Sequence, residues 1–228
     1  MTKIIQMRNI NKVYGTEVKQ QVLFDLNLDF EARTFNSIIG QSGSGKSTLL
    51  NILGTLDTPT SGEVFIDGIR TDQMTKRELA RLRNEKIGFI FQFHYLLPEF
   101  TVLENVLMPY RISHRKVPES IMERAEGLLE TVGLSEVKHK NATKISGGQQ
   151  QRTAIARALV NQPKIILADE PTGNLDSETT RTVYNLLRQL NEDYGTTFVV
   201  ITHDPAVAEK TDRVVEVKDG RVVMDILN

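Results

Sequence analysis

The chain has 228 residues and an almost neutral charge, with 28 lysines and arginines against 29 aspartates and glutamates. This length allows one large α/β domain or a core with a subdomain inserted into it. The balanced charge provides no basic field for nucleic acid, so we expect no nucleic-acid partner. The absence of cysteine excludes a disulfide framework and a thiolate metal site. No apolar run approaches the length of about 18 residues typical of a membrane span, and we expect neither a transmembrane segment nor a secretion signal.

Two early segments alternate apolar and polar residues, which is typical of strands with one buried face. They cover residues 4–10 and 22–30, and we expect antiparallel strands there. Tyr14 follows the first segment on a polar loop, ahead of a glycine-rich motif. Its ring could stack on an adenine base or pack within its own loop, and the residues alone favour the packed loop.

The glycine-rich motif follows an apolar strand at 34–39 and precedes a helix expected at 46–54. Its nine residues are Gly40, Gln41, Ser42, Gly43, Ser44, Gly45, Lys46, Ser47 and Thr48. Glycines allow backbone N–H groups to approach a triphosphate that larger side chains would block. Lys46 can reach the β- and γ-phosphates, and the Ser47 hydroxyl can ligate Mg²⁺ at the start of the helix. The motif therefore predicts a phosphate-binding loop for a nucleotide such as ATP.

The remaining pattern changes from strands to helices and back to strands. Helices at 103–110, 118–132 and 149–159 dominate residues 92–159, which predicts a helical insertion and not a linker. The other expected elements are a strand at 64–66 with a tight turn, a helix at 75–84, strands at 87–91, 164–169 and 197–201, a helix at 177–194, and a hairpin of 214–218 with 221–224.

Polar residues follow three apolar strands, at the strand ends that face a ligand in α/β sheets. Asp169 fits the Mg²⁺ ligand beside the loop serine, which leaves Glu170 to polarise an attacking water. His203 could donate to the γ-phosphate, although a lone histidine is often structural. Gln92 could contact Mg²⁺ or water, or it could simply cap a helix or face solvent.

A second glycine-containing motif, Ser146, Gly147, Gly148 and Gln149, opens the last helix of the insertion. It resembles an anion-binding helix start but has no lysine. A chain with one complete phosphate loop and one without lysine suggests that the second loop closes over a nucleotide held by another copy. A helix cap with flexible glycines is the alternative.

Taken together, these residues resemble the ATP-binding subunits of ABC transporters over essentially the whole chain. The resemblance implies an α/β fold with a RecA-like phosphate-loop core, an antiparallel β subdomain and an inserted α-helical subdomain. It divides the chain into residues 1–91 and 160–228 for the core with the β subdomain, and 92–159 for the helical subdomain. The implied cofactors are ATP and Mg²⁺, and the implied activity is ATP hydrolysis coupled to transport.

The resemblance also implies roles for single residues. Tyr14 would stack on adenine, residues 40–48 would be the Walker A motif, and Asp176 would lie in the D-loop across the dimer seam. The implied ATP-binding positions outside the Walker A motif are Tyr14, Ser146, Gly147, Gly148, Gln149 and Asp176. The implied catalytic residues are Lys46, Gln92, Glu170 and His203, and the implied metal ligands are Ser47, Gln92 and Asp169.

Two segments narrow the resemblance to one group of members within this family. Residues 91–98 and 170–176 are similar to the lipoprotein-releasing, macrolide-exporting and cell-division members, which work with few-helix permeases that transmit force. This implies a peripheral protein on the cytoplasmic face of the inner membrane that pairs with a second copy, with permease subunits and with an extracytoplasmic adaptor. The loop after Gln92 is rich in large apolar residues, and we expect it to receive a permease helix. These residues are Phe93, Tyr95, Leu96, Leu97 and Phe100.

Two other functions remain open from the sequence. One is an ATPase that regulates a membrane complex without transport, as the cell-division members suggest. The other is a soluble translation or DNA-repair ATPase of the same superfamily, which the short chain disfavours because those proteins resemble paired cassettes or carry long coiled coils.

Overall fold

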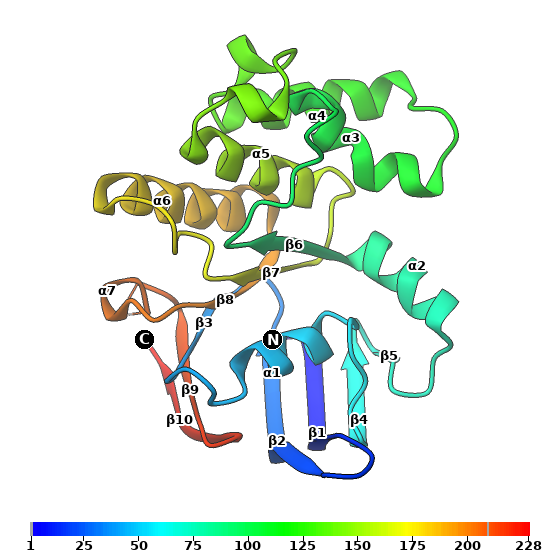
Figure 1. Cartoon of the computed structure of the whole chain (residues 1–228), viewed down its shortest axis with the longest axis vertical. Helices are drawn as coiled ribbons and strands as arrows, with labels where there is room; N and C mark the ends of the chain where they lie inside the picture. The colour runs from blue at the N-terminus through cyan, green and yellow to red at the C-terminus, as the bar shows by residue number, and fades with distance from the viewer. Residues whose placement is uncertain (1, 209) are drawn as a thin grey trace.

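The computed structural model, which describes residues 2–208 and 210–228, is built around a six-stranded sheet (Figure 1). Its strands in spatial order are β10 (Arg221–Leu227), β9 (Arg213–Lys218), β3 (Phe35–Ile39), β8 (Thr197–Ile201), β7 (Ile165–Asp169) and β6 (Ile87–Phe91). All neighbouring strands are parallel except β9 and β10, which form the antiparallel hairpin at one edge. β7 and β8 are almost fully buried, because helices or a second sheet cover both faces.

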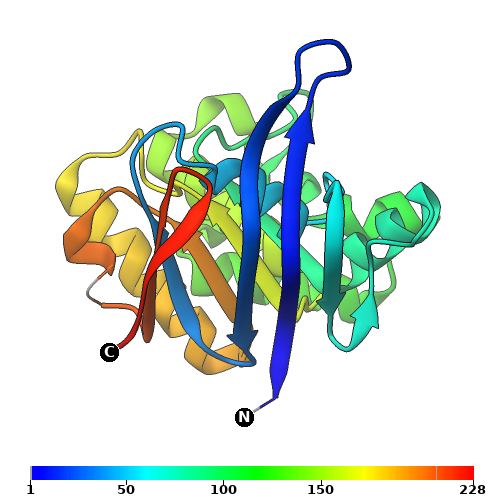
Figure 2. The ribbon, with the colours of Figure 1, turned by 90° about the horizontal axis from the view of Figure 1, so that it is seen from below.

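A second sheet is antiparallel, with the order β2 (Gln20–Glu31), β1 (Lys3–Tyr14), β4 (Ser61–Ile66) and β5 (Ile69–Arg70). Figure 2 shows β1 and β2 as two long strands side by side, joined by a loop at one end. Both strands are longer than the alternation predicted, because their pairing shifts register between Met7 and Ile10. Asn9 and Asp25 have φ values of 50° and 44° in this region, as expected for bulged residues. Such bulges interrupt the alternation of buried and exposed side chains that the sequence prediction relies on.

Helix α1 (Lys46–Leu53) lies between the two sheets. Leu49, Leu50, Ile52 and Leu53 belong to one hydrophobic core with residues of both sheets, such as Ile5 on β1 and Val199 on β8. Burial on both sides fixes the helix, and with it the loop that precedes the helix.

The opposite face of the six-stranded sheet is covered by helices (Figure 1). These are α5 (Gly147–Leu159) and α6 (Ser177–Tyr194), with α3 (Val102–Ser113) and α4 (Glu119–Thr131) packed on α5, while α2 (Lys76–Lys86) precedes β6. Capping boxes begin α2 at Thr75, α3 at Thr101 and α5 at Ser146. The α5 cap explains why this helix starts two residues earlier than the sequence prediction. Four short elements were not predicted: strand β5, the 3₁₀ turns Ser135–Val137 and Ala142–Lys144, and helix α7 (Pro205–Ala208). The expected α/β class with an antiparallel β part and an inserted helical part is confirmed.

Gly88 on β6 provides a test of the packing between the sheet and α5. A Cβ at this position would lie 2.4 Å from the carbonyl oxygen of Ala158, whereas a Cβ at Gly127 on α4 would meet no atom within 4 Å. Gly88→Ala should therefore lower the free energy of unfolding by roughly 1–3 kcal/mol. The matched change Gly127→Ala should raise it by about 0.5–1 kcal/mol, because alanine favours helix. Denaturant unfolding followed by circular dichroism measures both, and equal effects would contradict the predicted contact.

Candidate functional site

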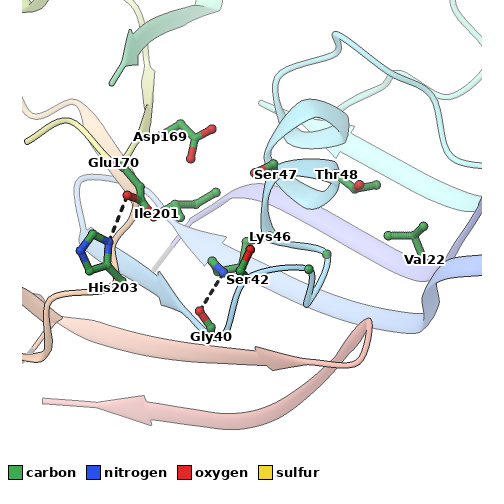
Figure 3. Close-up of a pocket in the computed structure, with 12 residues that line it drawn as sticks. Val22, Gly40, Ser42, Lys46, Ser47, Thr48, Asp169, Glu170, Ile201 and His203 are labelled. Atoms are coloured by element: carbon green, nitrogen blue, oxygen red, sulfur yellow. Dashed lines mark hydrogen bonds and ion pairs between the residues drawn. The ribbon is translucent and has the colours of Figure 1, made fainter. Parts of the chain in front are cut away.

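A cavity of about 480 Å³ lies between the glycine-rich loop and the ends of β7 and β8 (Figure 3). β3, β8 and β7 are parallel neighbours, and Ile201 pairs with both Ile38 and Asp169. The carboxyl ends of three strands therefore meet at one edge. The lining residues are Val22, Gly40, Ser42, Gly43, Gly45, Lys46, Ser47, Thr48, Asp169, Glu170, Ile201 and His203.

The loop is shaped by glycines with positive φ, a backbone conformation that disfavours other residues. Gly40 has a φ of 147°, and a Cβ there would lie 2.1 Å from the carbonyl oxygen of Val217. Gly45, at φ 102°, precedes α1 directly. The hydroxyl of Ser44 is buried and has no hydrogen-bond partner in the part of the chain that is described. An orphaned buried hydroxyl in a glycine cradle fits a loop made to surround an anion.

Lys46 is folded back onto its own loop. Its Nζ donates to the carbonyl oxygens of Gly40 and Gln41, both at 2.7 Å (Figure 3 draws the first). Burial lowers the pKa of Lys46, and the carboxylates of Glu170 and Asp169 act in the opposite direction. In the described part of the chain this ammonium donates to carbonyl oxygens alone, so phosphate oxygens would be stronger hydrogen-bond partners.

Asp169 and Glu170 lie side by side at the end of β7 but have different environments (Figure 3). Burial raises the pKa of Asp169, the charge of Glu170 raises it further, and Lys46 lowers it. Glu170 has a φ of 44°, a strained value for a residue with a side chain, and its N–H donates to the carbonyl oxygen of Ile201 at 3.0 Å. Its Oε2 lies 3.0 Å from Nδ1 of His203. Strain and hydrogen bonding thus aim one carboxylate at the exposed imidazole.

The donor set at the cavity suits Mg²⁺ bound together with phosphate. Ser47 supplies a hydroxyl and Asp169 a carboxylate. Among the described residues no group of three or more His, Cys, Asp and Glu side chains could hold a metal alone. Mg²⁺ is commonly bound by one or two protein oxygens, substrate phosphates and water, so this sparse set fits.

Gln92 does not line the cavity. Its Nε2 donates to Oδ1 of Asn174 at 3.3 Å, and Asn174 Nδ2 donates to its carbonyl oxygen at 3.4 Å. A Cβ on Gly173 would lie 2.6 Å from Gln92 Nε2. The glutamine is therefore tied to the segment after Glu170, and any role as a metal ligand requires it to leave this position.

Tyr14 has features of both alternatives considered for it, which are packing against its own surroundings and stacking on an adenine base. Its hydroxyl donates to Oδ2 of Asp57 at 2.7 Å, and Lys12 Nζ lies 4.7 Å from its ring centroid. The residue still exposes 40% of its surface and does not line the cavity. Lys12 and Asp57 were missed in the sequence because the pair is 45 residues apart. The tyrosine is thus anchored by its hydroxyl while part of the residue stays open to solvent.

The second glycine motif and Asp176 also lie outside the cavity. Ser146 caps α5 by accepting from Gln149 N–H at 3.3 Å, and Asp176 caps α6 by accepting from Thr179 N–H at 2.9 Å. Ser146, Gly147 and Asp176 are exposed. One chain therefore does not bring these residues to the phosphate loop. Val22 and Ile201 do line the cavity and were not predicted, although Ile201 ends β8 two residues before His203.

The loop after Gln92 borders a separate apolar cavity of about 660 Å³. Tyr95 and Leu97 line it, together with Ile112 of α3. Phe93 and Leu96 line a smaller neighbouring cavity of about 260 Å³, and Phe100 lines neither. Arg157 on α5 donates to the carbonyl oxygens of His94 and Tyr95, both at 2.7 Å, and so fixes this loop. No helix in the described part of the chain has the length and hydropathy needed to cross a membrane.

Comparison with known proteins agrees with this geometry. The family model described as ABC transporter matches residues 23–173. A lipoprotein-releasing system ATP-binding protein from Rhodopseudomonas palustris is 46% identical over 97% of this chain and 99% of the relative. Its counterpart from Aquifex aeolicus is 48% identical over 99% of both chains. The dimeric, post-hydrolysis structure of the ATP-binding cassette MJ0796 with ADP and Pi has a TM-score of 0.89 at 44% identity and covers 98% of both chains.

Lys46→Ala tests the phosphate loop. The lysine is the buried cation of the cavity, and a hydrogen bond to a charged group contributes about 1.5–3 kcal/mol, so ATP affinity should fall roughly 10- to 100-fold. Equilibrium binding of a fluorescent ATP analogue measures the change. Lys76→Ala on the exposed start of α2 is the matched control and should bind like the unaltered chain. Undiminished affinity of the Lys46 variant would refute the assignment.

Proposed function

The chain belongs to the family of ABC transporter ATP-binding subunits, and on this premise we propose that it powers a lipoprotein-releasing transporter. Its activity is the hydrolysis of ATP in a membrane ABC transporter. The observation that carries the proposal is the cavity in which the phosphate loop faces Glu170 and His203, 3.0 Å apart. Release of lipoprotein is supported by its relatives, lipoprotein-releasing system ATP-binding proteins that are 46–49% identical to it over nearly the whole chain.

We propose the following roles in hydrolysis. The loop N–H groups and Lys46 bind the phosphates, and Lys46 exchanges the carbonyl oxygens of Gly40 and Gln41 for phosphate oxygens. Ser47 and Asp169 hold Mg²⁺, which neutralises phosphate charge when bound. Glu170 accepts a proton from the attacking water, and His203 orients Glu170 and the γ-phosphate. Gln92 completes the site after it leaves Asn174.

A second copy of the chain supplies the missing half of the site. Ser146, Gly148 and Asp176 are proposed to contact nucleotide held by the partner copy, because their own cavity lies elsewhere. The cassette MJ0796, with a TM-score of 0.89 to this chain, is dimeric. ATP must favour the closed pair through its differential affinity for that state. A change in the balance from 1:99 to 99:1 needs about 5.5 kcal/mol, which several charge-assisted contacts can provide.

The proposed division is a core with the β subdomain, residues 1–91 and 160–228, and a helical subdomain, residues 92–159. It is supported by the ends of β6 at Phe91 and of α5 at Leu159, which flank the helical segment. Tyr14 is proposed to stack on adenine with its exposed part while Asp57 holds its hydroxyl.

Membrane permease subunits are the partners of ABC cassettes, and the apolar cavity beside Tyr95 is the proposed docking site for a permease helix. We place the protein peripherally on the cytoplasmic face of the inner membrane and propose an extracytoplasmic adaptor in the complex. Lipoprotein release by the reconstituted complex tests this function against an ATPase that only regulates a membrane complex.

Glu170→Gln tests the proton acceptor. The amide keeps the size of the side chain but loses its basicity, so turnover should fall about 10²–10⁴-fold while ATP still binds. The variant should accumulate dimers in size-exclusion chromatography with ATP and Mg²⁺, and not with ADP. A Lys46→Ala/Glu170→Gln variant, which binds ATP weakly, should remain monomeric. A monomer at saturating ATP in the single variant would refute the paired site.

Leu97→Ser combined with Ile112→Ser tests the docking cavity. Both side chains are exposed apolar lining residues, and interface anchors contribute on the order of 1–2 kcal/mol each. The permease concentration that half-maximally stimulates ATP hydrolysis should therefore rise at least about tenfold, while basal hydrolysis is retained. The control Val18→Ser removes an apolar side chain that is 85% exposed on the loop between β1 and β2. Unchanged stimulation of the double variant would contradict docking here.

A further inference from the structure

Tyr184 on α6 carries a buried hydroxyl that the described residues leave without a hydrogen-bond partner. The residue is only 8% exposed. A buried unsatisfied hydroxyl costs stability, whereas phenylalanine would fill the same space without that cost. An unpartnered polar group of this kind needs an explanation other than packing.

The surroundings of the hydroxyl connect it to the catalytic segments. A cavity of about 280 Å³ beside Tyr184 is lined by Leu175 and Ser177, around the start of α6, and by Asp204 and Val207, which follow His203. Burial has the largest effect on the pKa of Tyr184 and raises it, while the nearby hydroxyls of Thr202 and Thr172 lower it. Neither threonine is within the distance and angle of a hydrogen bond to the tyrosine hydroxyl. The tyrosine therefore stays protonated at neutral pH and keeps a proton to donate.

The two threonines belong to the two strand-end segments that carry the catalytic pair. Thr172 follows Glu170 by two residues, and Leu175 N–H donates to its carbonyl oxygen at 3.0 Å. Thr202 precedes His203 and is buried, and its hydroxyl accepts from Asp204 N–H at 3.1 Å. Glu170 and His203 themselves lie 3.0 Å apart. One hydroxyl on α6 thus lies next to both segments whose separation sets the catalytic geometry.

We propose that the Tyr184 hydroxyl is a positioning group that bridges Thr172 and Thr202 when the site closes on ATP, and so fixes Glu170 against His203. Tyr184 touches neither nucleotide nor water in this role and acts through the two threonines. α6 begins directly after Asp176, so engagement of Asp176 by a partner copy would reach the catalytic pair through the same tyrosine. The inference rests on the proposed roles of Glu170 and His203 in hydrolysis.

Tyr184→Phe removes only the hydroxyl and tests the inference in the full chain. We expect kcat for ATP hydrolysis to fall about tenfold, because Glu170 would be held less firmly against His203. This fall corresponds to a loss of about 1.4 kcal/mol of transition-state stabilisation. KM for ATP should stay within about twofold, and Tm should be unchanged or higher, because an orphaned buried hydroxyl is lost. Tyr194→Phe at the exposed end of the same helix is the matched control and should leave kcat, KM and Tm unaltered.

A double-mutant cycle with Thr172→Val tests the path of the effect. If the hydroxyl acts through Thr172, the double variant should be no slower than the slower single variant. Multiplicative losses would overturn the bridge, as would an unaltered kcat in Tyr184→Phe. A fall in kcat with a lower Tm would assign Tyr184 a merely structural role and overturn the inference as well. Failure of the unaltered chain to bind and hydrolyse ATP would instead refute the proposed function.

Discussion

The parallel pairing of β3, β8 and β7 is the constraint on which the site depends. Ile201 pairs with Ile38 on one side and with Asp169 on the other, so three strands end at the same level. A shift of one residue in any strand would exchange the faces of its side chains and remove Asp169 or the loop from the cavity. The apolar residues that make β7 and β8 fully buried therefore also determine where the carboxylate, the imidazole and the phosphate loop meet.

The site holds several groups in states that only a ligand would relieve. Lys46 is a buried cation on two carbonyl oxygens, Ser44 has an unpartnered hydroxyl, and Glu170 has a positive φ. Each of these arrangements reduces the stability of the chain by itself. The surrounding core compensates, because α1 is packed between two sheets and the backbone of Glu170 is fixed to Ile201. The groups proposed to bind phosphate are therefore held in place by the protein itself.

Much of the fold was predictable from local patterns in the sequence. Buried strands such as β8 and the helix α6 appear in the sequence with the bounds that the structure has, because an apolar run and a regular helical repeat need no distant information. The predicted lengths of β1 and β2 were too short, because bulges at Asn9 and Asp25 break the alternation of apolar and polar residues. The anchoring of Tyr14 by Asp57 and the tie between Gln92 and Asn174 were not predictable, because each joins segments more than 40 residues apart.

The two contacts of Arg157 with the loop after Gln92 have a mechanical consequence. α5 has 13 residues and is therefore a rod of about 20 Å, with Ser146 at its first turn and Arg157 in its last. Because the helix is rigid, a displacement of its Arg157 end also moves its Ser146 end. Pressure on the loop beside the apolar cavity would therefore tilt Gly147 and Gly148 at the start of α5, the helix end proposed to meet a second copy, and the stiffness of the 13-residue helix would set how closely that tilt follows.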